Sequence, residues 1–374
     1  MQFQINKSSL LKAISNVIGA IEKKSTIPVL QNLKITAKTF DEGAEFNLSL
    51  CATDMDITLE TQIHAEDVTS GGVTTVSAQT LFDSIRKIPD GLVTITQDNP
   101  NFLQIKSGKL KYNLPCIDAK EFPVIAEGTL ASSIKVDAEI LSRMIDDTKF
   151  AISSDPARYH LSGIFLQTIA NDNSETEVRA VATDGHRLSL SFSPTTAEDK
   201  FGVIIPRKAA FEIRKLIEGK KEISISVSDV KIKVQCGETT ILSKLIDGEF
   251  PPYDRVLPKN NDQIALVNRQ LLIDAIERVS TVATDKHRSI KLSFADNKII
   301  LQANSEETGS AQDEIDINYG GNPIDIGFNA KYLLDIIEQI GREEIIIKFR
   351  DSLSPAVVES QDLSAVFVIM PIRV

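Results

Sequence analysis

The chain has 374 residues, which exceeds the length at which one hydrophobic core keeps growing, so we expect two or three domains. Hydrophobic residues make up 42% of the chain and charged residues 25%, as in an ordinary globular protein, and the formal net charge is -11. This acidic balance argues against a protein coated with basic surface, but it leaves room for one face that binds nucleic acid.

The cysteines and the N-terminal segment indicate the cellular compartment in which the protein is found. Cys51, Cys116 and Cys236 are odd in number and form no Cys-x-x-Cys pair, so we expect neither a disulfide framework nor a zinc site. The first 14 residues lack the basic-then-apolar pattern of a signal peptide, and no run approaches 18 consecutive apolar residues. We therefore expect a cytoplasmic protein without a membrane span.

The first part of the chain predicts two helices and several strands. Apolar residues recur at helical spacing over 8–14 and 77–88. Residues 45–63 alternate between polar and apolar, and residues 92–96 are β-rich, so both segments are predicted strands. The part ends with the dipeptide at 122–123, Phe-Pro.

The middle part repeats this order. Helices are predicted over 138–145 and 206–217, an alternating segment spans 177–192, and a β-rich run follows at 223–227. A second Phe-Pro dipeptide, at 250–251, ends this part as well.

The last part has the same pattern again. Helices are predicted over 269–276 and 329–340, and strands over 290–303 and 345–349. The three parts therefore share one order of elements, which calls for a test of internal repetition.

The second helices of the three parts align residue by residue. In addition, residues 107–118 lie over 236–247 without a gap, at the same offset of 129 that relates the first two helices. Chance similarity among ordinary amphipathic helices is the alternative, and the shared register argues against it. The positions that coincide are Phe82, Phe211 and Leu334, then Asp83, Glu212 and Asp335, then Ile88, Ile217 and Ile340.

Each of these helices also begins and ends at suitable residues. The predicted starts are Ser77, the turn at Pro206, and Asn329, and the predicted ends lie near Pro89, Gly219 and Gly341.

We therefore predict an α+β fold of three similar units, at 1–124, 125–253 and 254–374, each with two helices packed on antiparallel sheet. Units that join edge to edge cover strand edges that would otherwise aggregate. A half-ring of three such units with complementary ends would close by head-to-tail pairing with a second copy.

Basic residues gather near several predicted helix ends, where they would meet phosphates without reading sequence. The pair Arg207-Lys208 stands at a helix start and opposes the helix dipole, which indicates an anionic partner. Ordinary solvated helix faces are the alternative. The residues concerned are Lys23, Lys24, Arg86, Lys87, Arg207, Lys208, Arg214, Lys215, Arg278, Lys286 and Arg288.

Enzyme patterns are scarce in this sequence. It has no GxxxxGK[ST], GxGxxG, HExxH or GxSxG motif, and its four histidines show no metal spacing. Asp184 and His186 could form an acid/base pair, as in a nuclease or transferase, although Asp-Gly more often marks a hairpin turn. A repeat scaffold that binds only protein is a further alternative.

Six segments together identify a family resemblance. They are RYHLSG at 158–163, ATDGHRL at 182–188, IPRK at 205–208, DGEFPPYDRVLPK at 247–259, IGFNAKYLLD at 326–335 and VIMPIRV at 368–374. In order and at family spacing over the whole chain, they make it similar to the β subunit of bacterial DNA polymerase III, the sliding clamp family. The resemblance implies three DNA-clamp domains per chain, half of a closed ring that encircles duplex DNA as a homodimer, with no catalysis, cofactor or metal.

The resemblance also implies a pocket that receives short peptide motifs from DNA polymerase subunits, the clamp loader and repair proteins. Apolar residues there would hold hydrophobic anchors, and Arg158, His186 and Arg255 would hold polar groups. The implied pocket residues are Arg158, Leu161, Thr183, Gly185, His186, Arg187, Leu188, Pro251, Arg255, Val256, Val368, Ile369, Met370, Pro371, Ile372, Arg373 and Val374.

The family resemblance identifies the DNA-contacting and dimer-contacting residues less directly than the pocket residues. The sequence departs from the best-known pattern at Gln79 and Thr80, where a basic pair is familiar, and at Asp155. Tyr112 and Val282 are the expected apolar contacts of the dimer. The expected DNA-facing residues are Lys23, Lys24, Arg86, Tyr159, His160, Arg207 and Lys208.

Overall fold

The computed structural model describes residues 1–22, 24–39, 46–130, 132–170, 175–195, 200–283, 288–359 and 364–373. Contacts divide the chain into two compact units. Unit 1 comprises residues 1–141 and 211–245, and unit 2 comprises residues 142–210 and 246–374. Among the described residues, no helix is long and apolar enough to cross a membrane.

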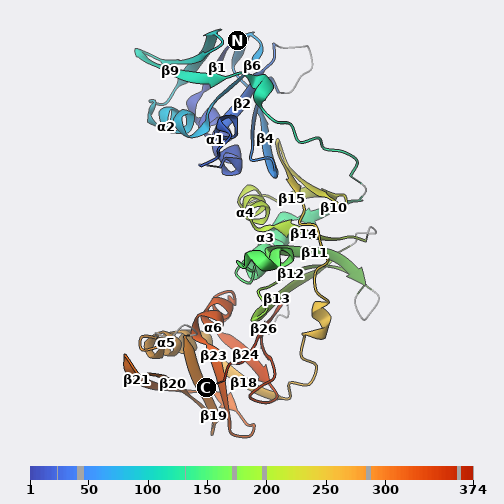
Figure 1. Cartoon of the computed structure of the whole chain (residues 1–374), viewed down its shortest axis with the longest axis vertical. Helices are drawn as coiled ribbons and strands as arrows, with labels where there is room; N and C mark the ends of the chain where they lie inside the picture. Colours follow the sequence, from blue (N-terminus) through green and yellow to red (C-terminus); the bar gives the residue numbers. More distant parts are fainter. Residues whose placement is uncertain are drawn as a thin grey trace. The chain divides into compact units, whose positions relative to one another are not determined.

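Unit 1 contains one antiparallel sheet with two helices, α1 (Lys7–Val17) and α2 (Ala78–Lys87), packed side by side on it (Figure 1). The strands, in sheet order, are β10 (Ser132–Asp137), β15 (Glu222–Val227), β16 (Lys231–Cys236), β17 (Thr239–Lys244), β4 (Ile57–Ile63), β3 (Leu48–Thr53), β2 (Asn32–Ala37), β6 (Gly72–Ser77), β9 (Leu110–Ile117), β8 (Phe102–Ser107), β7 (Leu92–Asn99), β1 (Gln2–Asn6) and β5 (Asp67–Ser70).

Unit 2 contains two antiparallel sheets, and α5 (Arg269–Ser280) packs beside α6 (Ala330–Ile337) (Figure 1). The first sheet has the order β14 (Gly202–Pro206), β11 (Gly163–Ala170), β12 (Thr176–Thr183), β13 (Arg187–Pro194), β26 (Ala365–Ile369), β25 (Ala356–Glu359), β24 (Glu344–Phe349), β18 (Gln263–Asn268) and β22 (Asn318–Tyr319). The second has the order β21 (Gly309–Asp316), β20 (Lys298–Ser305), β19 (Ser289–Ala295) and β23 (Ile324–Asn329).

Two helices cross the unit boundaries. Helix α3 (Ala138–Lys149) begins in unit 1, and α4 (Arg207–Leu216) begins in unit 2. The six predicted helices are confirmed, each within a few residues of its expected bounds. The division into three domains stays a prediction, because the compact units divide the middle repeat between two sheets.

Strand ends supply the caps that start five of the helices; at α3 the cap is Asp137, which accepts from Glu139 N at 2.7 Å. Asn6 ends β1 and accepts a hydrogen bond from Ser8 N at 3.0 Å, and Asn268 at the end of β18 accepts one from Leu271 N at 3.0 Å. The predicted N-caps Ser77 and Asn329 act in the same way, toward Thr80 N and Tyr332 N. A side-chain cap satisfies an N–H that the helix leaves unpaired, so the chain turns from strand to helix within one residue.

The helices bury one apolar face and the strands alternate, as the sequence predicts. In α2 the buried residues are Ala78, Leu81 and Ile85. In unit 2 the core beneath α5 and α6 includes Phe294 and Phe349, whose ring centroids lie 4.6 Å apart. Burial of apolar surface at ~25 cal/mol per Å² is the main stabilising contribution to such a core.

The three cysteines are free thiols. Cys51 is buried, and burial raises the pKa of its thiol to about 12, so it stays protonated and unreactive. The described residues contain no group of three or more acidic, histidine or cysteine side chains that could hold a metal ion.

Candidate functional site

The segment with the most specific sequence pattern forms a hairpin turn between β12 and β13. The Thr183 hydroxyl donates to Arg187 O at 2.7 Å, and one oxygen of Asp184 accepts from His186 N at 2.9 Å and Arg187 N at 3.1 Å. Gly185 has φ +88°, a left-handed conformation that favours glycine. The turn is therefore built from its own side chains and holds residue 186 at its tip.

This geometry does not favour an acid/base pair. The Asp184 carboxylate is occupied by two backbone N–H groups and by Arg187 Nε at 3.1 Å. The exposed imidazole of His186 instead lies on Tyr332 of α6, with ring centroids 6.0 Å apart and planes 22° apart. Asp184 thus has a structural role in the turn, and the hairpin interpretation of Asp-Gly is confirmed.

Arg187 ties this turn to two helices. Its side chain is only 8% exposed, its Nη1 donates to Asp335 of α6 at 2.6 Å, and its Nη2 donates to Phe150 O after α3 at 2.8 Å. The guanidinium also lies 4.4 Å from the Tyr332 ring centroid. Arg187 is a positioning residue here, because its donors are directed into the protein rather than toward a ligand.

The C-terminal tail runs along this hairpin. Leu188 pairs with Val368 and Arg187 with Ile369, and all four residues are buried. Beyond the strand, Met370 N donates to His186 O at 2.9 Å.

The tail then crosses to β23, where Ile372 N donates to Gly327 O at 2.9 Å. Met370 is 38% exposed, Pro371 and Ile372 are half-buried, and Arg373 is exposed. Val374 lies outside the described residues. Two backbone hydrogen bonds therefore fix an apolar strip whose side chains stand at the surface.

A short 3-10 helix, η4 (Pro156–Leu161), flanks the turn. Asp155 begins it by accepting from Ala157 N at 3.0 Å and pairs with Arg158 at 2.9 Å, and these two contacts lower the pKa of Asp155. Arg158 Nη1 lies so close to Gly185 that a Cβ there would be 2.6 Å away. Leu161 is buried in the same cluster as Leu188 and Val368.

The linker residues of the predicted pocket lie in or next to another 3-10 helix, η5 (Tyr253–Arg255). Its anchor is buried Tyr253, whose hydroxyl meets Gln167 and Arg179, and burial raises the pKa of Tyr253. Pro251, Arg255 and Val256 are exposed around this anchor. The predicted pocket set thus divides into exposed residues and buried residues that support them.

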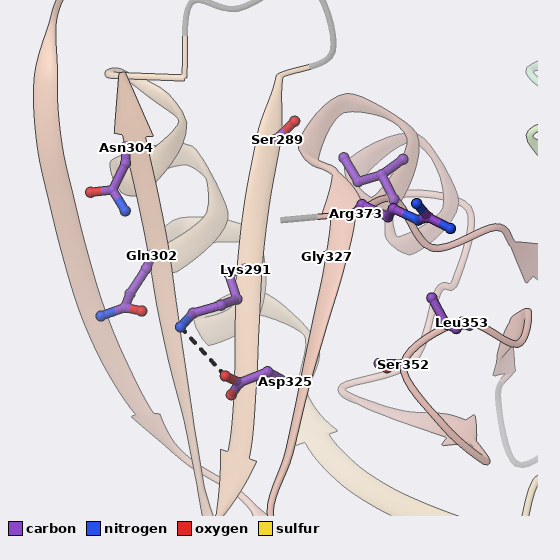
Figure 2. A pocket seen from close by; sticks show the side chains of 10 residues that line it. Ser289, Lys291, Gln302, Asn304, Asp325, Gly327, Ser352, Leu353 and Arg373 are labelled. Carbon is purple, nitrogen blue, oxygen red and sulfur yellow. Dashed lines mark hydrogen bonds and ion pairs between the residues drawn. The ribbon is translucent and has the colours of Figure 1, made fainter. Parts of the chain in front are cut away.

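A cavity of about 740 Å³ borders the tail (Figure 2). Only Ile372 and Arg373 of its lining belong to the predicted set. The polar outer face of the β19–β20–β23 sheet and the loop after β24 were not expected, because an outward polar row resembles any solvated sheet face. The lining residues are Ser289, Lys291, Gln302, Asn304, Asp325, Gly327, Ser352, Leu353, Ile372 and Arg373.

Comparisons with known proteins cover the whole chain. Three family models match it: the N-terminal domain of the DNA polymerase III beta subunit over residues 1–126, the central domain over 135–252 and the C-terminal domain over 254–373. The chain belongs to the DNA polymerase III beta subunit family. The beta sliding clamps of Caulobacter vibrioides and Pseudomonas putida are 39% and 35% identical to it, each over 100% of both chains.

Solved sliding clamps have the same fold. A crystal structure of a Caulobacter crescentus beta sliding clamp matches with a TM-score of 0.93 at 39% identity, and one from Bartonella birtlesii bound to griselimycin with 0.94 at 34%. Both matches cover 100% of each chain. The family is a processivity factor and not an enzyme, which agrees with the non-catalytic geometry of Asp184 and His186.

The DNA-facing residues expected for a clamp lie in both units. In unit 1, Lys24 is exposed and Arg86 pairs with Asp83 at 3.0 Å, whereas Lys23 lies outside the described residues.

In unit 2, Tyr159 is exposed and meets His160 edge-on, with ring centroids 5.8 Å apart. Arg207 is exposed at the first residue of α4, donates to Ile152 O at 3.4 Å, and is followed by half-buried Lys208. All of these stay predictions as DNA contacts.

The two expected dimer residues lie on different units. Tyr112 is half-buried on β9, in unit 1. Val282 follows α5 in unit 2, and its carbonyl oxygen accepts from the Thr308 hydroxyl at 2.7 Å, next to the start of β21. Their role in a dimer stays a prediction.

Proposed function

We propose that this chain is a sliding clamp that encircles duplex DNA as a head-to-tail homodimer and holds the replicative polymerase on it. The observation that carries this proposal is a pairing of two strands that occurs twice within the chain. In the first repeat and in the last repeat, one strand of the same kind lacks such a partner among the described residues.

This pairing joins the second strand of a hairpin to a later strand. In unit 1, β4 pairs with β17, Ile57 lies opposite Ser243, and Lys244 N donates to Asp56 O at 2.8 Å. In unit 2, β13 pairs with β26 in the same way, Arg187 lies opposite Ile369, and Met370 N donates to His186 O at 2.9 Å.

Two further strands, β9 and β21, occupy the same positions in their repeats as the paired strands, but the edge that would form this pairing has no partner in the described part of the chain. Residues 107–118, which contain β9, align with 236–247, which contain β17. Among the described residues, β9 pairs with β8 and, only at Cys116 and Ile117, with β6. β21, the second strand of the β20–β21 hairpin, pairs with β20 alone among the described strands. A second copy would complete the series by joining β21 to β9.

The charges of these edges are complementary. Lys109 and Lys111 are exposed at β9, whereas β21 carries the exposed Glu314 and Asp316 and the half-buried Asp313. Opposite charges at facing edges favour the head-to-tail pairing over pairing of like edges. Closure also covers two edges that would otherwise template aggregation.

A closed protein ring around the duplex would stay on the DNA without binding it tightly. Once the ring is closed, weak phosphate contacts through water allow sliding, and Lys24, Arg86, Arg207 and Lys208 are proposed to supply them. Opening would need a separate loader that uses ATP, because the sequence has no recognised nucleotide-binding motif.

Partners are proposed to bind the strip formed by the tail, the hairpin turn and η5. Exposed Met370 adapts to several hydrophobic anchors, and Arg158, His186 and Arg255 surround it with polar groups. DNA polymerase subunits, the clamp loader and repair proteins would thereby share the ring's attachment at high effective concentration. We also propose that the chain divides into three domains, at 1–124, 125–253 and 254–374, and that the protein is cytoplasmic.

Solution mass and DNA retention test the proposal together. We expect a mass of twice 41.1 kDa, and retention of the loaded protein on circular but not on linear DNA. Lys111→Glu should weaken the dimer, and adding Glu314→Lys should restore part of it if the two edges meet. A monomeric mass at all concentrations, or equal loss from circular and linear DNA, would refute the clamp function.

A further inference from the structure

The floor of the cavity beside the tail is the polar outer face of a rigid sheet. Lys291 on β19 lies opposite Gln302 on β20 and opposite Gly327 on β23. Because Gly327 has no side chain, the floor is open between Lys291 and the tail, where Ile372 N is bonded to Gly327 O (Figure 2). The cavity is therefore continuous with the strip that is proposed to hold hydrophobic anchors.

One wall of the cavity is a loop that presents an apolar side chain. Asp351 holds this loop, because one carboxylate oxygen accepts from Leu353 N at 2.9 Å and Ser354 N at 2.7 Å, while the other meets Arg350 Nε at 2.9 Å. Arg350 and these N–H groups keep the pKa of Asp351 well below its usual range. Leu353, in contrast, is 70% exposed at the cavity rim, where a ligand would cover it.

The charges in the cavity favour an acidic ligand. Lys291 and Arg373 are cations and Asp325 is the one anion of the lining, within a chain of net charge -11. The Lys291–Asp325 pair is loose, at 3.5 Å with both side chains partly exposed, so Lys291 can change partner at little cost. Asn304 adds a carboxamide that both donates and accepts, and Gln302, whose Nε2 donates to Gln312 at 2.7 Å, adds a carbonyl oxygen that accepts; both suit an extended polypeptide.

We propose that this cavity is a subsite for an acidic, extended segment of a partner polypeptide that flanks the hydrophobic motif held by the tail. The inference rests on the proposed function and adds a determinant of partner preference. A carboxylate of the segment meets Lys291 and Arg373, its backbone meets Gln302 and Asn304, and Leu353 packs on it. Partners with acidic flanks then bind more tightly than partners with the same motif and neutral flanks.

Peptide titrations against the full-length dimer test this subsite. The probes are a hydrophobic clamp-binding motif from a bacterial DNA polymerase, made alone and with two aspartates added before or after it, and griselimycin as a compact ligand. We expect one acidic extension to raise affinity about tenfold at low salt, and the gain to shrink as salt screens it.

Lys291→Glu should remove this gain without changing binding of the short peptide or griselimycin, whose retention also shows that the variant is folded. Lys331→Glu is the matched control, because it makes the same change of charge at an exposed lysine of α6 in the same unit, and Lys331 is absent from the cavity lining.

Two results would overturn the subsite. One is equal affinity of the wild type for the short and both extended peptides; the other is an equal loss of affinity in Lys291→Glu and Lys331→Glu, which would indicate a long-range charge effect. Failure of the wild type to bind the short peptide and griselimycin at all would instead overturn the proposed peptide-binding function.

Discussion

The link between Arg187 and Asp335 can be measured with a double-mutant cycle. Asp335→Ala removes a charge-assisted hydrogen bond of 2.6 Å, a type that contributes ~1.5–3 kcal/mol. Arg187 would still be neutralised by Asp184 at 3.1 Å. We therefore expect a loss of about 2 kcal/mol, below the ~3–5 kcal/mol for a buried charge left without any partner.

Arg187→Leu removes three donors at once and leaves Phe150 O without the Nη2 donor, so we expect a loss of about 3 kcal/mol. The double variant should lose little more than Arg187→Leu alone, which gives a coupling energy of about 2 kcal/mol. Hydrogen exchange at the amides of His186 and Arg187 is the suitable assay, because it reports local opening of the turn in a protein too large for two-state unfolding.

If the double variant lost the sum of the two single losses in the free energy of local opening, within about 0.5 kcal/mol, the view that Arg187 acts through Asp335 would be refuted. Asp83→Ala is the matched control. Asp83 has the aligned position in α2 and pairs with Arg86 at 3.0 Å, but both side chains are about half exposed, so its loss should cost less than about 1 kcal/mol and leave the turn unaffected.

Four further outcomes are expected. Deleting 370–374 should abolish peptide binding by calorimetry while the dimer mass persists, because β26 ends at Ile369; unchanged affinity would remove the tail from the site. Changing Arg207 and Lys208 to Glu should lower the slope of log affinity for duplex DNA against log salt by about 2, and an unaltered slope would remove them from the DNA-facing set. Met55→Gly should raise stability by up to ~1 kcal/mol, because Met55 has φ +78° in a turn like that of Gly185; a lower denaturation midpoint would contradict this reasoning. The lowered pKa of Asp351 means that its carboxylate supports its loop at and above pH 3.8 and that this support is lost only well below that pH, so acidification should shift the Ser354 amide signal in NMR spectra, whereas Asp351→Asn should lack that transition.

Helix positions and the hairpin turn could be predicted from the sequence because their determinants are local. Apolar spacing predicts α2, α4 and α6, and Ser77 and Asn329 cap their helices as expected. The turn at Asp184-Gly185 also follows from residue type, since only a few residues accept its backbone conformation.

The partners of Arg187 could not be predicted, because they are not local. Asp335 is 148 residues away in the sequence, and a strand arginine gives no sign of whether it faces solvent or a helix. For the same reason the predicted pocket set combined exposed residues such as Met370 with buried residues such as Leu188 and Val368. Leu353 was missed because a single apolar residue in a polar loop carries no pattern.

The aligned acidic residues show how one repeat position diverges. Asp335 binds Arg187 and Asp83 binds Arg86, whereas the partner of Glu212 of α4 in the described part of the chain is Lys215, at 4.0 Å. Its Oε2 is buried and makes no hydrogen bond within the described residues. The strand position that carries Arg187 in the β12–β13 hairpin is Ile57 in the β3–β4 hairpin, so the acid has lost its arginine.

The unlike edges of β9 and β21 have a consequence for assembly. Because each copy would offer one edge of either kind, nothing in the contact itself limits the number of copies to two. Closure on two copies therefore depends on the angle that each copy introduces between its two contacts. A substitution that changed this angle would keep every bond of the contact and yield open polymers instead, so such variants should form fibres rather than dissociate.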